Sequence, residues 1–456
     1  MYDVLVIGGG PGGYAAAIRA AQLGGRTALV EAGLIGGACV NFGCIPTKVW
    51  HRAAYLAHYL KTASDFGLQA ALGRLDLNGL KARKDGVSGD IRMGMEGLLK
   101  NNGVDVIAGR ARLEGPGRAA VDGRPLEAGK IILATGGTLA VPDVPGLEEA
   151  VLTTTQALDL TSLPASVLVW GAGPIEVEMA CCLAVFGVKV SLAAADSRLL
   201  PREDHDTSQR LAQALRELGL ELLLGYRLES VTPAAGAFTA RLTGPEEKEL
   251  TVERVLIGGR RPNPDGLGAR EAGLKLNPDG GVKVNEKLET SVPGVYAIGD
   301  LTGGWMLSHA ATAMGIAAAE NARGQNKKFP FHLVPRVVWT IPEAAAVGWS
   351  EEEAEKQGLE VETGSFPYPI NGLAMCRGEL TGAVKVVFDP RQGEILGVHI
   401  VGAGATELIG EACLVMQLEG TVRELAAGFR AHPTFSESVV DAARDALGWA
   451  LYLPKR

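Results

Sequence analysis

Several features that define other protein classes are scarce in this chain. Its 456 residues include only six cysteines, too few for a secreted scaffold held together by disulfides. No apolar run reaches the length of about 18 residues that would predict a membrane span. The chain passes from Met1 into the apolar strand pattern Tyr2–Ile7 without a charged leader, so we expect no signal peptide. We therefore expect a soluble, cytoplasmic protein, in which a cysteine pair is more often catalytic than structural.

Positive charge is scarce as well. The 44 Lys and Arg residues face 52 Asp and Glu residues, which gives a formal net charge of −8. A nucleic-acid surface needs clustered Lys and Arg, so we expect no nucleic-acid partner. The cysteines form no CxxC pair, which disfavours zinc, and we expect no metal site. Glycine is abundant, with 61 residues, which is typical of a chain whose backbone often approaches ligands closely.

Two segments of the chain resemble each other. VLVIGGGPGGYAAA begins at Val4 and VLVWGAGPIEVEMA begins at Val167, and each joins an apolar strand, a glycine turn and a helix-like stretch. Such repeated starts predict two doubly wound α/β dinucleotide-binding domains. From about Phe331 the pattern changes, and predicts a C-terminal α+β domain with two adjacent strands followed by two helices, at 384–388, 395–401, 405–419 and 422–428.

The first of these segments has the stronger binding motif. Gly8, Gly10 and Gly13 form GxGxxG directly after a strand pattern and at the start of a helix pattern. This spacing lets the main chain reach a pyrophosphate, and the helix N-terminus supplies partial positive charge. Glu31 ends the next strand, where a carboxylate can accept hydrogen bonds from a ribose 2′-OH. The strand context and the acid favour a dinucleotide site over a glycine turn without a ligand.

The glycine motif alone does not distinguish FAD from NAD. A strand pattern at 295–300 ends in Gly299 and Asp300, and a strand-end Asp beside a glycine could bind the ribitol hydroxyls of a flavin. Another strand pattern, at 130–134, leads into Thr135 and Gly136, which are further candidate contacts. We interpret these residues together as an FAD site.

A cysteine pair follows the first nucleotide-binding unit. The segment GGACVNFGCIPTK begins at Gly36 and contains Cys39 and Cys44. Positions five apart on a helix lie near one another, although a disulfide there needs local distortion, which Gly43 and Pro46 could supply. Such a small, strained ring should be easier to reduce than a structural disulfide. The alternative of buried free thiols suits the other four cysteines, Cys181, Cys182, Cys376 and Cys413.

The GGACVNFGCIPTK segment resembles the active-site stretch of the pyridine nucleotide–disulfide oxidoreductases, and the resemblance covers essentially the whole chain. It implies that Cys39 exchanges with a thiol substrate, that Cys44 faces the flavin, and that Lys48 pairs with Glu178 near the flavin. It also implies a homodimer in which each chain has four domains. We assign the FAD, NAD(P), central and interface domains to residues 1–150, 151–267, 268–331 and 332–456.

A histidine near the C-terminus is the second candidate catalytic group. In AHPTFSE, His432 precedes Glu437 by five residues. A carboxylate can fix the tautomer of an imidazole and raise its basicity, and thiol–disulfide exchange needs a base because the thiolate is the nucleophile. A lone histidine at such a place is more often structural, but the cysteine pair favours the catalytic interpretation. The segment is similar to the family's HPTxSE motif, whose histidine acts in the active site of the opposite subunit.

Three features are typical of the dihydrolipoamide dehydrogenase branch of that family. Phe435 lies inside the HPTxSE motif and would suit an apolar lipoyl chain. MLSHA from Met306 resembles that branch's MLAH stretch, and NGLA from Asn371 with GELTG from Gly378 resembles its NGRA…GE…G pattern. Mercuric reductase would instead need a C-terminal cysteine pair, and no cysteine follows Cys413. The resemblance therefore implies a lipoyl-bearing carrier protein or a small dithiol as the partner.

The second glycine motif departs from the family. Gly171 and Gly173 are present, but Glu176 stands where the third glycine belongs. A carboxylate there adds bulk and negative charge near a doubly anionic ligand, and it could itself occupy the anion site at the helix N-terminus. The next strand pattern, at 188–194, ends in Ala194, where NAD-type members carry an acid. We therefore expect poor use of NAD(H) unless other contacts compensate.

The choice between NAD and NADP depends on the residues after that strand. NADP-type members carry basic residues at the positions of Ala195 and Asp196, and an acid at the second position would repel a 2′-phosphate. Arg198 is the only base nearby, so NAD is favoured over NADP. The GRRPN segment from Gly259, which closes the domain in the family, is intact, and its Arg261 is a candidate cofactor contact.

The sequence thus predicts an enzyme in which NAD⁺ oxidises a dihydrolipoyl group through FAD and the Cys39–Cys44 disulfide, with His432 as base. In an alternative, the same centre reduces another disulfide, a quinone or a metal ion. In a third interpretation, the chain is a non-enzymatic flavoprotein component of a larger redox complex. Glu176 and Ala194 keep that interpretation open, because they suggest a degenerate nucleotide site.

Overall fold

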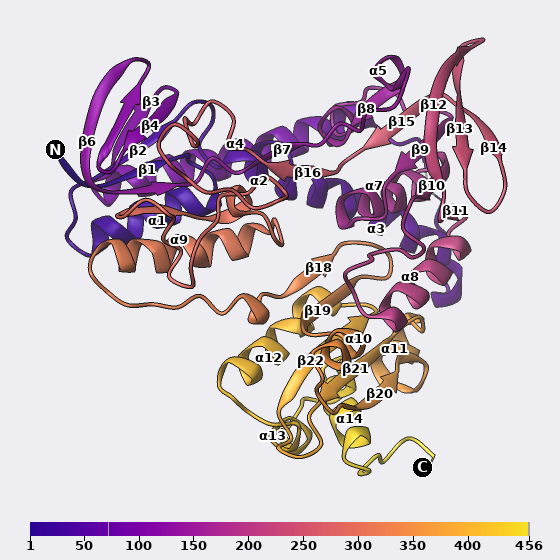
Figure 1. Cartoon of the computed structure of the whole chain (residues 1–456). Helices are drawn as coiled ribbons and strands as arrows, with labels where there is room; N and C mark the ends of the chain where they lie inside the picture. The colour runs from indigo at the N-terminus through magenta and orange to yellow at the C-terminus, as the bar shows by residue number, and fades with distance from the viewer. Residues whose placement is uncertain (72, 455–456) are drawn as a thin grey trace. The chain divides into compact units, whose positions relative to one another are not determined.

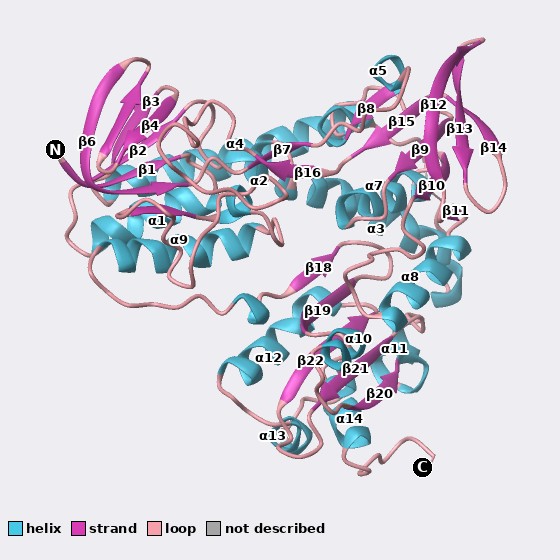
Figure 2. Ribbon diagram, in the orientation of Figure 1, coloured by secondary structure: helices cyan, strands magenta, loops and turns pink. Residues whose placement is uncertain are grey.

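A computed structural model describes residues 1–71 and 73–454 (Figures 1 and 2). The interface domain was predicted to extend to residue 456, so its last two positions lie outside the described residues. The chain divides into two compact units. Unit 1 comprises Met1–Trp50, Asp76–Val141 and Gly259–Phe329, and unit 2 comprises His51–Leu75, Pro142–Gly258 and the chain from Pro330 onward.

A seven-stranded sheet lies at the centre of unit 1. Its strand order is β3-β2-β1-β6-β5-β4, and β17 pairs with β6. The pairs β1–β2, β2–β3, β1–β6 and β6–β17 are parallel, whereas the pairs β4–β5 and β5–β6 are antiparallel. The strands are β1 Tyr2–Ile7, β2 Thr27–Glu31, β3 Asp105–Ala108, β4 Ala111–Gly115, β5 Arg118–Val121, β6 Arg124–Leu133 and β17 Val295–Ala297, and a separate two-stranded sheet joins β7 Gly137–Leu139 to β16 Arg260–Pro262.

The side chains of β1 divide between two hydrophobic cores, because successive strand residues point to opposite faces of a sheet. Val4 and Val6 pack in a core with α1 and α9, whereas Leu5 and Ile7 pack in a core with β4 and β5. A strand that is buried on both faces explains why the β1 sequence is apolar without alternation. The helices of unit 1 are α1 Pro11–Gln22, α2 Gly37–Asn41, α4 Leu77–Asn101 and α9 Ser308–Ala322, and α3 Cys44–Thr62 continues into unit 2.

Helices α1 and α9 lie side by side, although they come from opposite ends of unit 1 in the sequence (Figure 1). Two glycines permit this approach. A Cβ atom on Gly315 would lie 2.3 Å from the carbonyl oxygen of Gly12, and a Cβ atom on Gly12 would lie 2.9 Å from the carbonyl oxygen of Ala311. Neither position therefore accepts a side chain without separation of the two helices.

Unit 2 contains the second dinucleotide-binding fold. Its parallel sheet has the strand order β11-β10-β9-β15-β8, and an antiparallel sheet has the order β12-β13-β14. The elements are α5 Leu147–Ala150, β8 Val151–Thr153, α6 Thr154–Ala157, β9 Ser166–Trp170, α7 Pro174–Val185, β10 Lys189–Ala194, α8 His205–Glu217, β11 Glu221–Leu224, β12 Arg227–Ala234, β13 Ala237–Thr243, β14 Lys248–Val252 and β15 Arg254–Ile257.

The C-terminal part of unit 2 is an antiparallel sheet in the order β18-β19-β22-β21-β20, and several helices share its hydrophobic core. The predicted neighbours at 384–388 and 395–401 do pair, as β21 and β22. The elements are β18 Arg336–Val338, β19 Ala344–Gly348, α10 Glu351–Lys356, β20 Glu362–Pro367, α11 Gly372–Arg377, β21 Ala383–Phe388, β22 Ile395–Val401, α12 Ala405–Gln417, α13 Val422–Ala427 and α14 Glu437–Ala446.

The predicted fold class is confirmed: two α/β sheets, each with neighbouring parallel strands, are followed by a C-terminal α+β part. The end of one predicted strand is wrong. The strand expected at 295–300 ends at Ala297, because Gly299 has a φ of +64° and starts a 3₁₀ turn, Gly299–Thr302. The four domain boundaries stay a prediction. Among the described residues, no helix is long and apolar enough to cross a membrane.

The glycine contact between α1 and α9 predicts that a Gly→Ala change at this contact destabilises the protein, whereas the same change elsewhere in a helix stabilises it. Gly315→Ala should lower the free energy of unfolding by about 1–3 kcal/mol, because the added methyl group overpacks the contact. Gly86→Ala is the matched control, since Gly86 lies in the middle of α4 with nothing within 4 Å of its Cβ position. That change should stabilise by roughly 0.5–1 kcal/mol. Urea unfolding of the flavin-bound protein measures both, and equal stabilisation by both changes would contradict the contact.

Candidate functional site

The first glycine loop, Gly8–Gly13, joins β1 to α1 in unit 1. Gly8 has a φ of +107°, and a Cβ atom on it would lie 2.2 Å from the carbonyl oxygen of Ala134. A Cβ atom on Gly13 would lie 1.7 Å from the carbonyl oxygen of Gly8, so both positions require glycine. Gly10 is the N-cap of α1, and the nearest atom to a Cβ placed there would be Cα of Gly37 at 3.9 Å. This open space at a helix N-terminus fits a pyrophosphate.

Glu31 lies at the end of β2, next to β1 and the first glycine loop. Its carboxylate accepts hydrogen bonds from the main-chain N–H groups of Gly9 and Gly33, both at 2.6 Å. These bonds fix the side chain beside the loop, at the place where a ribose of the dinucleotide would lie. The structure therefore brings Glu31 together with the glycine motif, as the spacing in the sequence predicted.

Asp300 and the 134–137 segment complete this region. The side chain of Asp300 pairs with Arg260 at 3.5 Å, and Arg260 also donates to the carbonyl oxygen of Gly137 at 2.7 Å. Burial raises the pKa of the Asp300 carboxyl, and Arg260 opposes this shift. Thr135 donates to the carbonyl oxygen of Asn263 at 2.8 Å, and the carbonyl oxygen of Gly136 accepts from Asn263 at 3.0 Å. The carboxyl ends of the parallel strands thus carry a group of residues that fits FAD.

The cysteine pair is part of the same unit but does not lie on one continuous helix. Cys39 belongs to α2, and Cys44 is the first residue of α3. Phe42, with a φ of −138°, interrupts the helical backbone between them. Both cysteines are thiols in this structure, with Cys39 partly buried and Cys44 exposed. The local distortion that a disulfide between these positions needs is therefore present in the backbone.

Asn41 holds the turn between the two cysteines. Its amide group donates to the carbonyl oxygens of Ile35 and Gly37, at 3.0 and 2.9 Å. The amide oxygen accepts a hydrogen bond from Arg92 of α4 at 3.0 Å. Sequence reasoning gave Asn41 no role, although its position inside the CVNFGC segment could have indicated one.

The surroundings of Cys39 favour its thiolate form. A hydrogen bond with Cys44 is the largest cause that lowers the pKa of Cys39 to about 7, against the opposing effect of burial. A hydrogen bond from Ser308, whose Oγ lies 3.2 Å from Sγ, and the positive charge of Lys48 act in the same direction. A substantial fraction of Cys39 is therefore a nucleophilic thiolate at neutral pH.

Ser308 contacts the thiol of Cys39, and sequence reasoning gave this serine no role. It is the first residue of α9, and the packing of α9 on α1 brings it to Cys39 across 269 positions of sequence. A signal was present, because MLSHA has a serine where the MLAH stretch of the dihydrolipoamide dehydrogenase branch has an alanine. The serine has a hydroxyl that contacts the thiol of Cys39, and an alanine has no group that could make this contact.

His432 and Glu437 lie together in unit 2, as predicted. Nδ1 of His432 is 2.9 Å from Oε1 of Glu437, and the imidazole is 78% exposed. The main-chain N–H of Thr434 donates to the other carboxylate oxygen at 2.8 Å. Asn371 donates to the carbonyl oxygen of Thr434 at 2.9 Å and so fixes the loop. With its Nδ1 proton held by Glu437, the ring presents Nε2 as the basic nitrogen.

The interpretation of Phe435 as a residue that suits an apolar substrate chain is wrong. Its side chain is only 8% exposed and belongs to the C-terminal hydrophobic core. The ring stacks on Tyr368, with centroids 5.3 Å apart and an angle of 14° between the planes. An apolar residue inside a loop motif can serve packing as well as binding, and here the contacts show packing.

The second glycine loop, Gly171–Glu176, joins β9 to α7 in unit 2. Gly171 has a φ of +128°, like the first glycine of the first loop, and Gly173 is the N-cap of α7. Glu176 lies in the first turn of α7 and is only 5% exposed. Burial raises the pKa of its carboxyl, while main-chain N–H groups of Glu176 and Gly258 donate to the carboxylate and oppose this shift. The carboxylate is thus turned inward, toward the loop.

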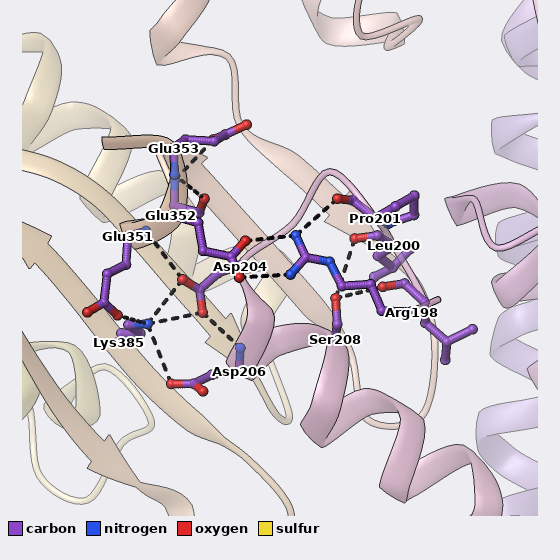
Figure 3. A network of polar contacts seen from close by, with 12 residues as sticks. Arg198, Leu200, Pro201, Asp204, Asp206, Ser208, Glu351, Glu352, Glu353 and Lys385 are labelled. Atoms are coloured by element: carbon purple, nitrogen blue, oxygen red, sulfur yellow. Dashed lines mark hydrogen bonds and ion pairs between the residues drawn. The ribbon is translucent and has the colours of Figure 1, made fainter. Parts of the chain in front are cut away.

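The residues that would distinguish NAD from NADP follow β10. Ala194 ends the strand and is buried, whereas Asp196 is exposed. Arg198 makes two parallel hydrogen bonds to the carboxylate of Glu352, at 3.0 and 2.9 Å, and a third to the carbonyl oxygen of Pro201 at 3.2 Å (Figure 3). The guanidinium of Arg198 is therefore committed to a carboxylate of the C-terminal part of the chain.

Other predicted site residues have defined partners of their own. The main-chain N–H of Trp339 donates to the carboxylate of Glu178 at 2.9 Å, within unit 2. Arg261 belongs to β16 of unit 1 and pairs with Asp265 at 2.9 Å. Lys48 lies on α3 and acts on Cys39 through its charge. The pairing of Lys48 with Glu178 and the cofactor contact of Arg261 stay predictions.

Comparison with known proteins gives two family matches. Residues 2–315 match the family described as pyridine nucleotide-disulphide oxidoreductase, and residues 334–443 match the dimerisation domain of the same family. A dihydrolipoyl dehydrogenase of Thermus scotoductus is 41% identical over 100% of this chain and 99% of the relative. A leghemoglobin reductase of Vigna unguiculata is 36% identical over 97% of this chain and 87% of the relative.

Solved structures show the same similarity. LpdA from Mycobacterium tuberculosis has a TM-score of 0.88 at 30% identity, and the match covers 97% of this chain and 99% of that chain. The HOCl-induced flavoprotein disulfide reductase RclA from Escherichia coli has a TM-score of 0.85 at 28% identity, over 97% of this chain and 99% of that chain. The similarity therefore extends over both units.

The hydrogen bond from Ser308 predicts a measurable shift in the reactivity of Cys39. In the reduced protein, the alkylation rate of Cys39 should rise with pH around a midpoint near 7, because only the thiolate reacts. Ser308→Ala should move the midpoint upward by about one unit, since a hydrogen bond to a charged group contributes roughly 1.5 kcal/mol. Iodoacetamide labelling, followed at each cysteine by mass spectrometry, measures this. Exposed Cys376 is the internal control, and an unmoved Cys39 midpoint would contradict the assignment.

Proposed function

Because this chain belongs to the pyridine nucleotide–disulphide oxidoreductase family, we propose that it oxidises the dihydrolipoyl group of a carrier protein, or a small dithiol, with NAD⁺. The chain is an FAD-dependent oxidoreductase of the dihydrolipoyl dehydrogenase type, so the non-enzymatic interpretation is not retained. The observation that carries the proposal is the Cys39–Cys44 pair with its thiolate-stabilising contacts, in the same unit as a glycine loop that fits FAD.

The first step transfers the substrate to the cysteine pair. His432, oriented by Glu437, removes the proton of one substrate thiol. The resulting thiolate attacks Sγ of Cys39 in the Cys39–Cys44 disulfide. A substrate–Cys39 disulfide forms, the bond between the cysteines breaks, and Cys44 leaves as a thiolate.

The second step closes the substrate ring. The remaining substrate thiol loses its proton and attacks the substrate sulfur that is bound to Cys39, so the lipoyl disulfide forms and Cys39 leaves as a thiolate. The contacts of Cys39 with Ser308 and Lys48 stabilise this leaving group. The substrate has then lost two electrons, and the protein holds a reduced cysteine pair.

FAD bound at the first glycine loop, with Glu31 and Asp300 among the residues that would hold it, would supply a two-electron path from the reduced cysteines to the pyridine nucleotide. NAD⁺ is the proposed acceptor, rather than NADP⁺, because Arg198 is held by Glu352 and exposed Asp196 would repel a 2′-phosphate. The dimerisation-domain match supports a homodimer, in which we place His432 of one subunit at Cys39 of the other.

The proposal predicts that turnover depends on Cys39 and not on the partly buried or exposed thiols outside the Cys39–Cys44 pair. Cys39→Ser should retain FAD but lose oxidation of dihydrolipoamide, because a hydroxyl cannot form the substrate–protein disulfide. Cys376→Ser is the matched control and should keep its activity, since Cys376 is an exposed thiol on α11. Absorbance of bound flavin and steady-state oxidation of dihydrolipoamide measure both properties. Normal turnover by Cys39→Ser would assign the exchange to another thiol.

His432 is expected to contribute a large factor to the rate. His432→Gln should slow dithiol oxidation by roughly 10²–10⁴-fold, the usual contribution of a positioned general base, with little change in flavin content. His332→Gln, a change at another exposed histidine of unit 2, is the control.

Mixed dimers test the cross-subunit placement. Dimers that combine one His432→Gln subunit with one Cys39→Ser subunit should regain one working site, although each parent dimer is inactive. Hybrids confirmed by native mass spectrometry but without activity would show that His432 acts within its own subunit.

A further inference from the structure

The two glycine loops of this chain can be compared with each other position by position. In the first loop, the side of Gly10 on which a Cβ would project is open, with Cα of Gly37 the nearest atom at 3.9 Å. In the second loop, a Cβ on the corresponding glycine, Gly173, would lie 2.8 Å from Oε2 of Glu176. The second glycine of such a loop lacks a side chain so that a pyrophosphate can approach the main chain. In unit 2, a carboxylate oxygen of Glu176 lies on the side of Gly173 from which the pyrophosphate would approach.

The rest of the Glu176 side chain lies across the same loop. Its Cγ, Cδ and Oε1 atoms would be 3.0–3.2 Å from a Cβ on Gly171, and Oε1 would be 3.1 Å from a Cβ on Gly258 at the end of β15. At the equivalent place in unit 1, a Cβ on Gly8 would lie 2.2 Å from the carbonyl oxygen of Ala134, because strand and loop are in direct contact. The Glu176 side chain is therefore inserted between the second loop and the neighbouring strand end.

The carboxylate also uses the donors that an anionic ligand would need. The main-chain N–H groups of Glu176 and Gly258 donate to it, and the first turn of α7 places its negative charge at the positive end of the helix dipole. The side chain is only 5% exposed, so these bonds form in a region shielded from water. A dinucleotide pyrophosphate would compete for the same N–H groups and the same partial charge.

We propose that Glu176 is an intramolecular competitor of the pyridine nucleotide: its carboxylate holds the anion-binding position of the second glycine loop, and the dinucleotide binds only after the side chain has moved out. The inference deepens the proposed function and rests on it, because it takes the second loop as the site of the electron acceptor. It makes Glu176 a residue that sets nucleotide affinity independently of the dithiol chemistry at Cys39.

The competition has a specific signature among ligands. A ligand with a pyrophosphate, such as ADP-ribose, needs the position that the carboxylate holds. AMP has the same adenosine but no pyrophosphate, so it competes much less. Two substitutions separate space from charge: Glu176→Gly removes both the bulk and the charge, whereas Glu176→Gln keeps the bulk and removes the charge.

The test is calorimetric titration of the flavin-bound dimers with ADP-ribose and with AMP. Glu176→Gly should bind ADP-ribose at least tenfold more tightly than the native protein, and Glu176→Gln should bind it with intermediate affinity. The affinity for AMP should change by less than twofold. Glu217→Gln is the matched control, because Glu217 is an exposed acid at the end of α8 in the same nucleotide-binding fold. It should bind both ligands as the native protein does.

The outcomes distinguish the alternatives. Unchanged affinity for ADP-ribose in Glu176→Gly would overturn the proposal, and so would an equal gain for ADP-ribose and AMP, which would indicate a general loosening of the fold. A gain in Glu176→Gly without any in Glu176→Gln would overturn the part of the proposal that depends on charge. Failure of dihydrolipoamide to reduce the flavin of the native protein would instead contradict the proposed function, because that half-reaction does not involve the second loop.

Discussion

The direct contact of main chain with main chain around the first glycine loop is the constraint on which the site in unit 1 depends. The loop can touch the end of β6 only because Gly8 and Gly13 lack a Cβ atom. In the same way, α1 can touch α9 only because Gly12 and Gly315 lack a Cβ atom. The first contact leaves the N-terminus of α1 open to a pyrophosphate and puts Glu31 beside it. The second brings the start of α9, and with it Ser308, to the thiol of Cys39. The redox centre and the cofactor site are therefore positioned by the same helix.

The sequence predicted those parts of the site that depend on local spacing. The glycine motif with Glu31, the Cys39–Cys44 pair and the His432–Glu437 pair each lie within a short stretch of chain, and each pattern has a direct structural meaning. Ser308 could not be assigned in this way, because its contact with Cys39 spans 269 positions and depends on the packing of two helices. Phe435 shows the opposite limit: the motif identified the residue, but only the stack on Tyr368 shows that it packs in the core.

In the loop after β10, packing against the C-terminal part of the chain engages Arg198, a base near the end of the nucleotide-binding strand, in an ion pair. Arg198 pairs with Glu352, and the neighbouring Asp204, which is almost fully buried, pairs with Lys385 at 3.1 Å (Figure 3). Burial lowers the pKa of the adjacent His399 to about 4, so this ring is neutral at physiological pH and adds no unpaired charge to the network. These ion pairs join the nucleotide-binding fold of unit 2 to the C-terminal sheet. They leave the loop with little positive charge to offer a phosphate.

The contact between α1 and α9 also has a consequence for the order of events during protein synthesis. Ser308 lies 286 positions beyond Gln22, the last residue of α1. At about 5–20 residues per second, α9 leaves the ribosome roughly 15–60 s after α1. During that interval the apolar face of α1 lacks its native partner, while the nucleotide-binding segment of unit 2, Pro142–Gly258, is synthesised. Unit 1 can therefore close only after its third segment, Gly259–Phe329, has been made, and the C-terminal part of unit 2 follows it.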